Sequence, residues 1–135
     1  MEIILRGHLA SRGRVEGIAL VSSKPFEFRH VDTKRGIIFA SGHNLEGQSV
    51  KNKILVFPYG CGPTTEEWGL YELKKAGVVP KAIVCMSAYP CSTIGAIISN
   101  IPMVYGFDCN LLEVIQTGDH LWVDADKGLV RVSKR

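Results

Sequence analysis

Residues 54–73, which read ILVFPYGCGPTTEEWGLYEL, decide the fold of this chain. The first four, Ile54–Phe57, are continuously apolar, which predicts a strand covered on both faces. Pro58 has no N–H to donate, so we expect the strand ladder to stop there. Apolar residues from Trp68 to Ala76 then follow a helical period and end at Gly77, a favourable helix C-cap. The stretch therefore predicts a strand, a turn and a helix.

The turn between this strand and helix is the predicted functional centre. Gly60 and Gly62 allow backbone angles closed to other residues, and they let a ligand approach the main chain. Pro63 fits the first turn of a helix, and Thr64 or Thr65 can cap its N–H groups. A glycine turn that leads into an exposed helix N-terminus is a common binding site for anions in α/β proteins.

The next two apolar segments extend this unit into a βαβαβ arrangement. Residues 82–86 and 101–105 predict further strands parallel to the first, and residues 92–99 predict a short helix between them. Residues 121–124 and 129–132 predict a hairpin.

The N-terminal part of the chain predicts additional strands. Residues 3–9 and 15–22 alternate apolar and polar and suggest an antiparallel pair, and Phe26 and Phe28 flank Glu27 in a strand-like pattern. We therefore predict one α/β domain over residues 1–135, with three layers (β/β/α) in which a central parallel sheet is joined by a second, antiparallel sheet and a helical layer.

Composition and charge narrow the functional classes. A hydrophobic share of 46% and a charged share of 21% are those of an ordinary globular domain. The net charge is only +3, without basic stripes, so we expect no nucleic-acid partner. No apolar segment approaches the roughly 20 residues that cross a bilayer, and the first residues lack signal-peptide features. We expect a cytoplasmic protein without a membrane partner.

Cysteine and histidine side chains are candidate metal ligands and nucleophiles. The four cysteines at positions 61, 85, 91 and 109 form no Cys-x-x-Cys pair, so we expect no metal site within this chain. Cys61 lies between the two turn glycines, where it is either a nucleophile near a helix N-terminus or a structural thiol. His43, in the polar loop 41–47, either contacts substrate or is a solvated loop residue. Cys85 is expected in the core.

Motifs spread over nearly the whole chain, from about Leu5 to Val132, resemble one family, the small subunit of aconitase X. They are Gly13–Val21, Gly42-His43, Gly47–Val50, Lys53–Pro58, Leu73, Gly77, Pro80–Ile83, Gly95-Ala96, Ile101–Val104 and Thr117–Asp119.

The resemblance implies a swivelling domain, the mobile part of aconitase-like hydro-lyases (dehydratases). It implies a heterodimer with a separate large subunit that carries an iron–sulfur cluster and most of the site for a small hydroxy acid, such as phosphomevalonate or a hydroxyproline. It also implies no cofactor in this chain, and makes the turn with Gly60, Cys61 and Gly62 the part that meets the substrate. His43 is a candidate contact to the substrate or to the large subunit.

The chain departs from the family at the central turn. The family pattern is Gly-x-Gly-Ser, with the serine as catalytic base, whereas here Gly62 is followed by Pro63. Proline has neither a hydroxyl nor an N–H. Two interpretations stay open. Either Thr64 or Thr65 replaces the serine as the base, supported by nearby N–H groups, or the chain is a non-catalytic binding or regulatory module of the same fold.

Overall fold

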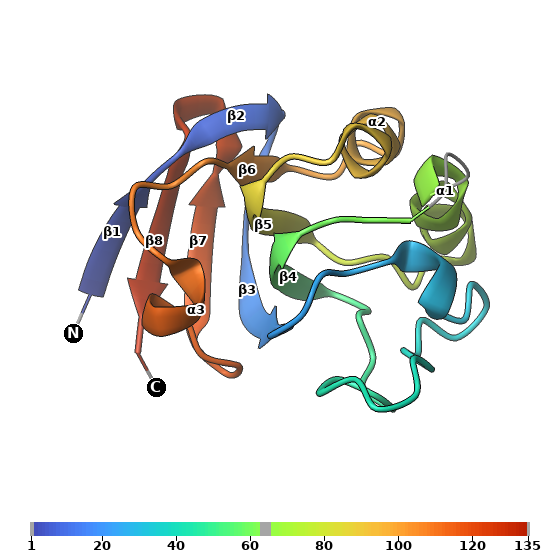
Figure 1. Cartoon of the computed structure of the whole chain (residues 1–135). Coiled ribbons are helices and arrows are strands. Elements are labelled where there is room, and N and C mark those ends of the chain that lie inside the picture. The colour runs from blue at the N-terminus through green and yellow to red at the C-terminus, as the bar shows by residue number, and fades with distance from the viewer. Residues whose placement is uncertain (1, 63–65, 135) are drawn as a thin grey trace.

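The computed structural model describes residues 2–62 and 66–134, except for the side chains of Glu66 and Glu67 (Figure 1). Its strands are β1 (Glu2–Arg6), β2 (His8–Ser11), β3 (Arg14–Val21), β4 (Lys53–Tyr59), β5 (Ala82–Ser87), β6 (Met103–Tyr105), β7 (His120–Asp124) and β8 (Leu129–Ser133). Its helices are α1 (Glu66–Ala76), α2 (Pro90–Ile98) and α3 (Leu111–Val114), with the short 3₁₀ turns η1 (Phe28–His30) and η2 (Ala125–Lys127).

The strands form one mixed sheet in the order β1-β8-β7-β3-β4-β5-β6-β2. The predicted parallel strands are present, because β3, β4, β5 and β6 pair in parallel. The predicted hairpin is β7 and β8. Strand β3 pairs in parallel with β4 and antiparallel with β7, so the two predicted sheets are portions of one continuous sheet.

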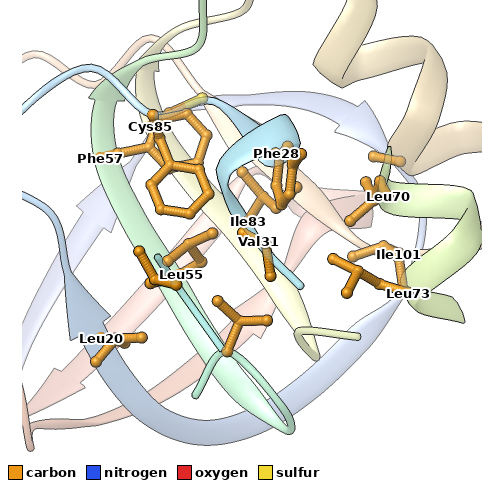
Figure 2. Close-up of a cluster of buried hydrophobic side chains, with 14 of the residues drawn as sticks. Leu20, Phe28, Val31, Leu55, Phe57, Leu70, Leu73, Ile83, Cys85 and Ile101 are labelled. Atoms are coloured by element: carbon orange, nitrogen blue, oxygen red, sulfur yellow. The ribbon is translucent and has the colours of Figure 1, made fainter. Parts of the chain in front are cut away.

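Strand β4 carries the core on both of its faces, as its apolar run predicted. Leu55 and Phe57 belong to a cluster with residues of α1, α2 and η1 (Figure 2). Ile54 and Val56 belong to a second cluster with residues of β7, β8 and α3. All four side chains have 0% exposure. Each such burial stabilises the fold by about 2 kcal/mol relative to an exposed side chain.

The second cluster brings the antiparallel portion of the sheet against the parallel portion. Leu121 and Val123 of β7 and Val130 of β8 share it with Ile54 and Val56 of β4. The helices α1 and α2 lie on the opposite side, at the right of Figure 1. This arrangement of β, β and α layers confirms the predicted fold class.

The predicted N-terminal antiparallel pair is wrong. Strand β1 pairs with β8, and β2 pairs with β6 at the far edge of the sheet. The chain changes direction at Gly7, whose N–H donates to the Gly128 carbonyl at 2.7 Å. A Cβ at Gly7 would lie 2.6 Å from the Tyr105 carbonyl oxygen. The alternation of side chains identified these strands but contained no information about their partners.

Pro58 does not end strand β4, contrary to expectation. Pairing with β3 stops at Val56, whereas pairing with β5 includes Tyr59, opposite Ser87. Because no residue of β3 pairs beyond Val56, the ladder is one-sided at Pro58 and tolerates a residue without an N–H.

Candidate functional site

The central turn lies where the carboxyl ends of the parallel strands β4 and β5 meet. Tyr59, the last residue of β4, pairs with Ser87, the last residue of β5. The chain after β4 and the chain that leads into α2 are therefore neighbours. In open parallel sheets, ligands bind outside the carboxyl ends of the strands. The location predicted from the glycine pattern is at this edge.

The two glycines of the turn are needed for different reasons. Gly62 has a φ of +111°, which side-chain-bearing residues rarely adopt. At Gly60, an added Cβ would lie 2.5 Å from the Ser92 Oγ atom and 3.1 Å from the Tyr89 Cβ atom. Gly60 therefore permits the close approach of α2, a protein element, where the sequence suggested a ligand.

One flank of the turn is held by the backbone of Phe26. The Phe26 N–H donates to the Tyr59 carbonyl at 3.0 Å, and the Cys61 N–H donates to the Phe26 carbonyl at 3.1 Å. These bonds form a parallel bridge between Phe26 and Gly60. The segment that follows is the 3₁₀ turn η1 and not the predicted strand, because the backbone after Glu27 closes a short bond from the Val31 N–H to the Phe28 carbonyl at 3.1 Å.

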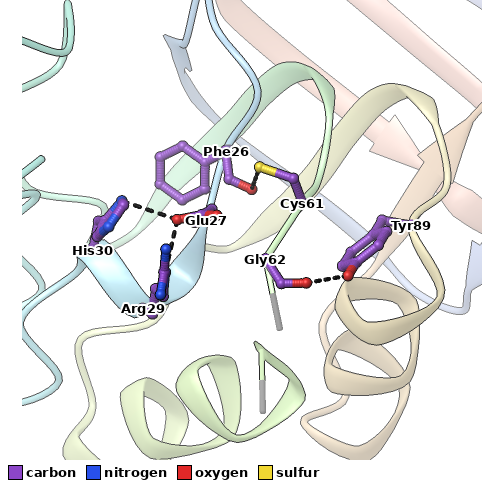
Figure 3. A network of polar contacts seen from close by, with 7 residues as sticks. All are labelled: Phe26, Glu27, Arg29, His30, Cys61, Gly62 and Tyr89. Atoms are coloured by element: carbon purple, nitrogen blue, oxygen red, sulfur yellow. Dashed lines mark hydrogen bonds and ion pairs between the residues drawn. The ribbon is translucent and has the colours of Figure 1, made fainter. Parts of the chain in front are cut away.

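The other flank of the turn is held by a side chain. The Tyr89 hydroxyl, at the start of α2, donates to the Gly62 carbonyl (Figure 3). The Gly60–Gly62 backbone is therefore hydrogen-bonded on both sides, to Phe26 before η1 on one side and to Tyr89 before α2 on the other.

Charged groups gather beside the turn. The Glu27 carboxylate accepts a hydrogen bond from the Arg29 Nε atom at 2.8 Å and lies 3.3 Å from the His30 Nδ1 atom (Figure 3). The bond from Arg29 is the main cause that lowers the pKa of Glu27, and the Cys61 thiol contributes a further hydrogen bond. The Glu27 carboxylate is thus held in its ionised form.

His43 is held as a neutral imidazole by its hydrogen bonds. The Leu45 N–H donates to the His43 Nδ1 atom at 3.0 Å, which places the ring proton on Nε2. That atom lies 3.0 Å from the Ser22 Oγ atom. Burial is the first cause that lowers the pKa of His43, and the positive charge of Lys24 is the second. Both ring nitrogens of His43 therefore hydrogen-bond to groups of the protein itself.

A pocket of about 290 Å³ opens next to the turn. Its lining includes Phe26, Ile38 and Ala40, and it also includes Glu27, His30, His43, Lys24 and Cys61. The lining of the pocket thus includes both Cys61 and His43. It combines an apolar wall with ionisable groups of both signs, the usual composition of a small-molecule site.

Pro63, Thr64 and Thr65 lie outside the described residues, so their predicted roles stay predictions. Cys85 is fully buried in the core, as expected. In residues 2–62 and 66–134, no group of three or more His, Cys, Asp or Glu side chains is placed to hold a metal ion. Within the same ranges, no helix is both long and apolar enough to span a bilayer.

Sequence reasoning missed Phe26, Tyr89 and Ser92 as parts of the turn's surroundings. Phe26 is 35 residues from Cys61, and no local pattern connects them. The sequence could have placed Tyr89 near the turn, because Tyr89 follows a strand that was predicted to be parallel to β4. The carboxyl ends of adjacent parallel strands meet at one edge, so the residues after each strand are neighbours.

Comparison with known proteins agrees with this geometry. A family model described as the aconitase X swivel domain matches residues 4–132. The phosphomevalonate dehydratase small subunit of Methanosarcina acetivorans is 40% identical over 133 residues, which cover 98% of this chain and 92% of that protein. The subunit of the same name from Thermococcus sibiricus is 44% identical over 131 residues, covering 96% and 98%.

The fold also matches a solved structure. The crystal structure of Thermococcus kodakaraensis aconitase X in its holo-form superposes with a TM-score of 0.92 at 41% identity, covering 98% of this chain and 99% of that one. Family match, relatives and structure agree over nearly the full length. The chain belongs to the aconitase X swivel-domain family.

Proposed function

We propose that this chain is the small subunit of an aconitase X-type hydro-lyase that dehydrates a hydroxy acid such as phosphomevalonate. The observation that supports this most directly is the Gly60–Gly62 turn, held on both flanks at the carboxyl edge of the sheet, beside a pocket. The names of the relatives support a large partner subunit, and the heterodimer and the cytoplasmic location are part of the proposal.

The chemistry is divided between the two subunits. Dehydration removes a proton from one carbon and a hydroxyl from its neighbour. The resemblance to aconitase X assigns an iron–sulfur cluster to the large subunit, where its iron would act as a Lewis acid on the hydroxyl. This chain's part is to hold the turn in place, accept the proton at a hydroxyl of Thr64 or Thr65, and exclude water when the domain closes.

A second candidate is a non-catalytic binding or regulatory module, and it is favoured by Pro63 at the family's serine position. A thiol-dependent enzyme using Cys61 is disfavoured by geometry. The Cys61 thiol lies 4.0 Å from the Phe26 carbonyl oxygen and hydrogen-bonds the Glu27 carboxylate. Both neighbours are acceptors, whereas a reactive thiolate needs cationic or donor neighbours.

Co-expression with an aconitase X-type large subunit tests the proposal. We expect a stable complex that dehydrates mevalonate 5-phosphate, measured by product formation under anaerobic conditions. Replacement of the base, by Thr64→Ala or Thr65→Ala, should lower kcat by at least about 100-fold, the usual contribution of a general base. A separate variant, Cys61→Ala, tests the thiol hypothesis, and we expect it to retain dehydratase activity.

Other outcomes separate the candidates. An active complex that is indifferent to both threonine substitutions would refute the threonine base. An inactive complex that gains activity with Pro63→Ser would identify the chain as a non-catalytic module. Failure to form any complex would favour an independent protein, and loss of activity in Cys61→Ala would revive the thiol hypothesis.

A further inference from the structure

Tyr89 stands at the junction between β5 and α2 and reaches the central turn. It is the residue immediately before α2, with extended backbone angles. Its hydroxyl donates to the carbonyl of Gly62, as Figure 3 shows. The contact therefore joins a side chain that follows β5 to the backbone of the turn that follows β4.

The backbone and the Cβ atom of Tyr89 are anchored. The Tyr89 carbonyl accepts hydrogen bonds from the Thr93 N–H and from the Thr93 hydroxyl, both at 3.0 Å. Its Cβ atom lies against Gly60, at a place where an added Cβ would come within 3.1 Å. The backbone and the base of the side chain are thus fixed, and the hydrogen bond to Gly62 places the phenol beside the turn.

The Gly62 carbonyl has a particular need for such a donor. The peptide group that joins Gly62 to Pro63 has no N–H, since its nitrogen belongs to proline. The carbonyl is therefore the only hydrogen-bonding group of that peptide. Gly62 also has a φ of +111°, and glycine has more rotational freedom than other residues. Without a fixed donor at this carbonyl, the orientation of the peptide would be poorly determined.

The orientation of this peptide matters for an acidic substrate. A peptide carbonyl oxygen carries partial negative charge, so an unpaired carbonyl that faces a carboxylate or phosphate disfavours binding and catalysis. The Tyr89 hydroxyl donates to the Gly62 carbonyl oxygen from the side of the turn that faces α2. The opposite flank of the turn is fixed independently, by the bond from the Cys61 N–H to the Phe26 carbonyl at 3.1 Å.

We propose that Tyr89 is a positioning residue, whose phenol orients the Gly62 carbonyl and thereby the Gly60–Gly62 turn that meets the acidic substrate. The inference rests on the proposed hydro-lyase function for its catalytic consequence. The role of Tyr89 in holding the turn is independent of it. Tyr89 acts through the backbone and does not contact the reacting atoms.

The test uses Tyr89→Phe, which removes the hydroxyl and retains the ring. The matched control is Tyr105→Phe, since Tyr105 is also half-buried and its ring lies 5.6 Å from that of His8, in a different part of the sheet. Two readouts are measured. The first is the ¹³C shift of the Gly62 carbonyl and the exchange rate of the Cys61 amide in the full chain. The second is kcat and KM in the complex with the large subunit.

We expect Tyr89→Phe to shift the Gly62 carbonyl resonance and to accelerate exchange of the Cys61 amide. In the complex, kcat should fall by about tenfold, the equivalent of one hydrogen bond, while KM changes by less than about twofold because only positioning is lost. Tyr105→Phe should leave all four quantities unchanged.

An unchanged Gly62 resonance, or a shifted resonance with an unchanged kcat, would overturn the inference. If the wild-type complex has no dehydratase activity, the proposed function fails and the catalytic consequence of Tyr89 is rejected with it. The Gly62 resonance still decides, in that case, whether Tyr89 holds the turn.

Discussion

The contact between Gly60 and α2 leads to a quantitative prediction for Gly60→Ala. Gly60 does not have a positive φ, so alanine is compatible with the backbone and only the added methyl group is tested. That methyl would lie 2.5 Å from the Ser92 Oγ atom, which is well inside contact distance. Ser92 is 1% exposed and has little space in which to rotate away.

The expected magnitude follows from two opposing effects. Overpacking of a close contact costs about 1–3 kcal/mol. Alanine also restricts the unfolded chain, which stabilises by about 0.4–1 kcal/mol. We therefore expect Gly60→Ala to lower the free energy of unfolding by about 1–2 kcal/mol.

The partner substitution, Ser92→Ala, tests the mechanism. The Ser92 hydroxyl is buried and has no hydrogen-bond partner among the described residues. Its removal should be neutral or should stabilise by up to about 1 kcal/mol, since an unsatisfied buried hydroxyl is unfavourable. In the double variant, the nearest atom to the new methyl becomes the Tyr89 Cβ atom at 3.1 Å. Most of the cost of Gly60→Ala should therefore disappear.

The assay is urea-induced unfolding of the two single variants and the double variant, followed by circular dichroism. We expect a favourable coupling energy of about 1 kcal/mol between positions 60 and 92. Ser99→Ala is the matched control, because Ser99 is also buried and unpartnered within the described chain but is at the other end of α2. Additive effects of Gly60→Ala and Ser92→Ala would refute the packing argument, as would an equal coupling with Ser99→Ala.

Three further predictions concern other parts of the chain. Burial lowers the pKa of His43 from its ordinary 6.5, so below that pH the unfolded state binds a proton that the folded state does not. The free energy of unfolding should therefore decrease as pH falls through 6.5. His43→Gln should flatten that dependence in unfolding curves at several pH values, and an unchanged slope would contradict the prediction. Burial raises the pKa of the Cys85 thiol to about 12. Iodoacetamide should therefore modify Cys91 but not Cys85 in the folded chain, as measured by peptide mass spectrometry. Rapid labelling of Cys85 in the folded chain would contradict this prediction. The Lys134 ammonium lies 2.5 Å from the fully buried Asp119 carboxylate. Lys134→Ala should therefore lower the free energy of unfolding in urea by about 2 kcal/mol. A decrease below about 0.5 kcal/mol would show that the ion pair does not contribute to stability.

The sequence and the structure contributed differently to the description of the turn. The apolar run of β4, the paired glycines and the period of α1 are local patterns, because they follow from backbone sterics and from solvent exclusion along one segment. They predicted a candidate site at the turn, which the structure places at the carboxyl edge of the parallel strands. The resemblance to a known family then supplied its chemical interpretation and revealed the substitution at Pro63.

Local patterns also gave wrong answers where the outcome depended on distant residues. The alternation in β1, β2 and β3 identified strands, but their partners are β8, β6 and β7 with β4. Pro58 was expected to stop a strand, and it is tolerated because β3 has already ended. In both cases the deciding interaction comes from a segment far away along the chain.

By itself, the sequence determined most of the strands and helices. The family resemblance that it carries indicated an α/β swivelling domain, and its glycine pattern predicted a functional centre at the Gly60–Gly62 turn. Only the tertiary structure decided what holds that turn: the backbone of Phe26 on one side, and Tyr89 with Ser92 on the other. The physical reason is that propensity and hydrophobic period act over a few residues, whereas hydrogen bonds and close packing between the ends of different strands exist only after the sheet has assembled.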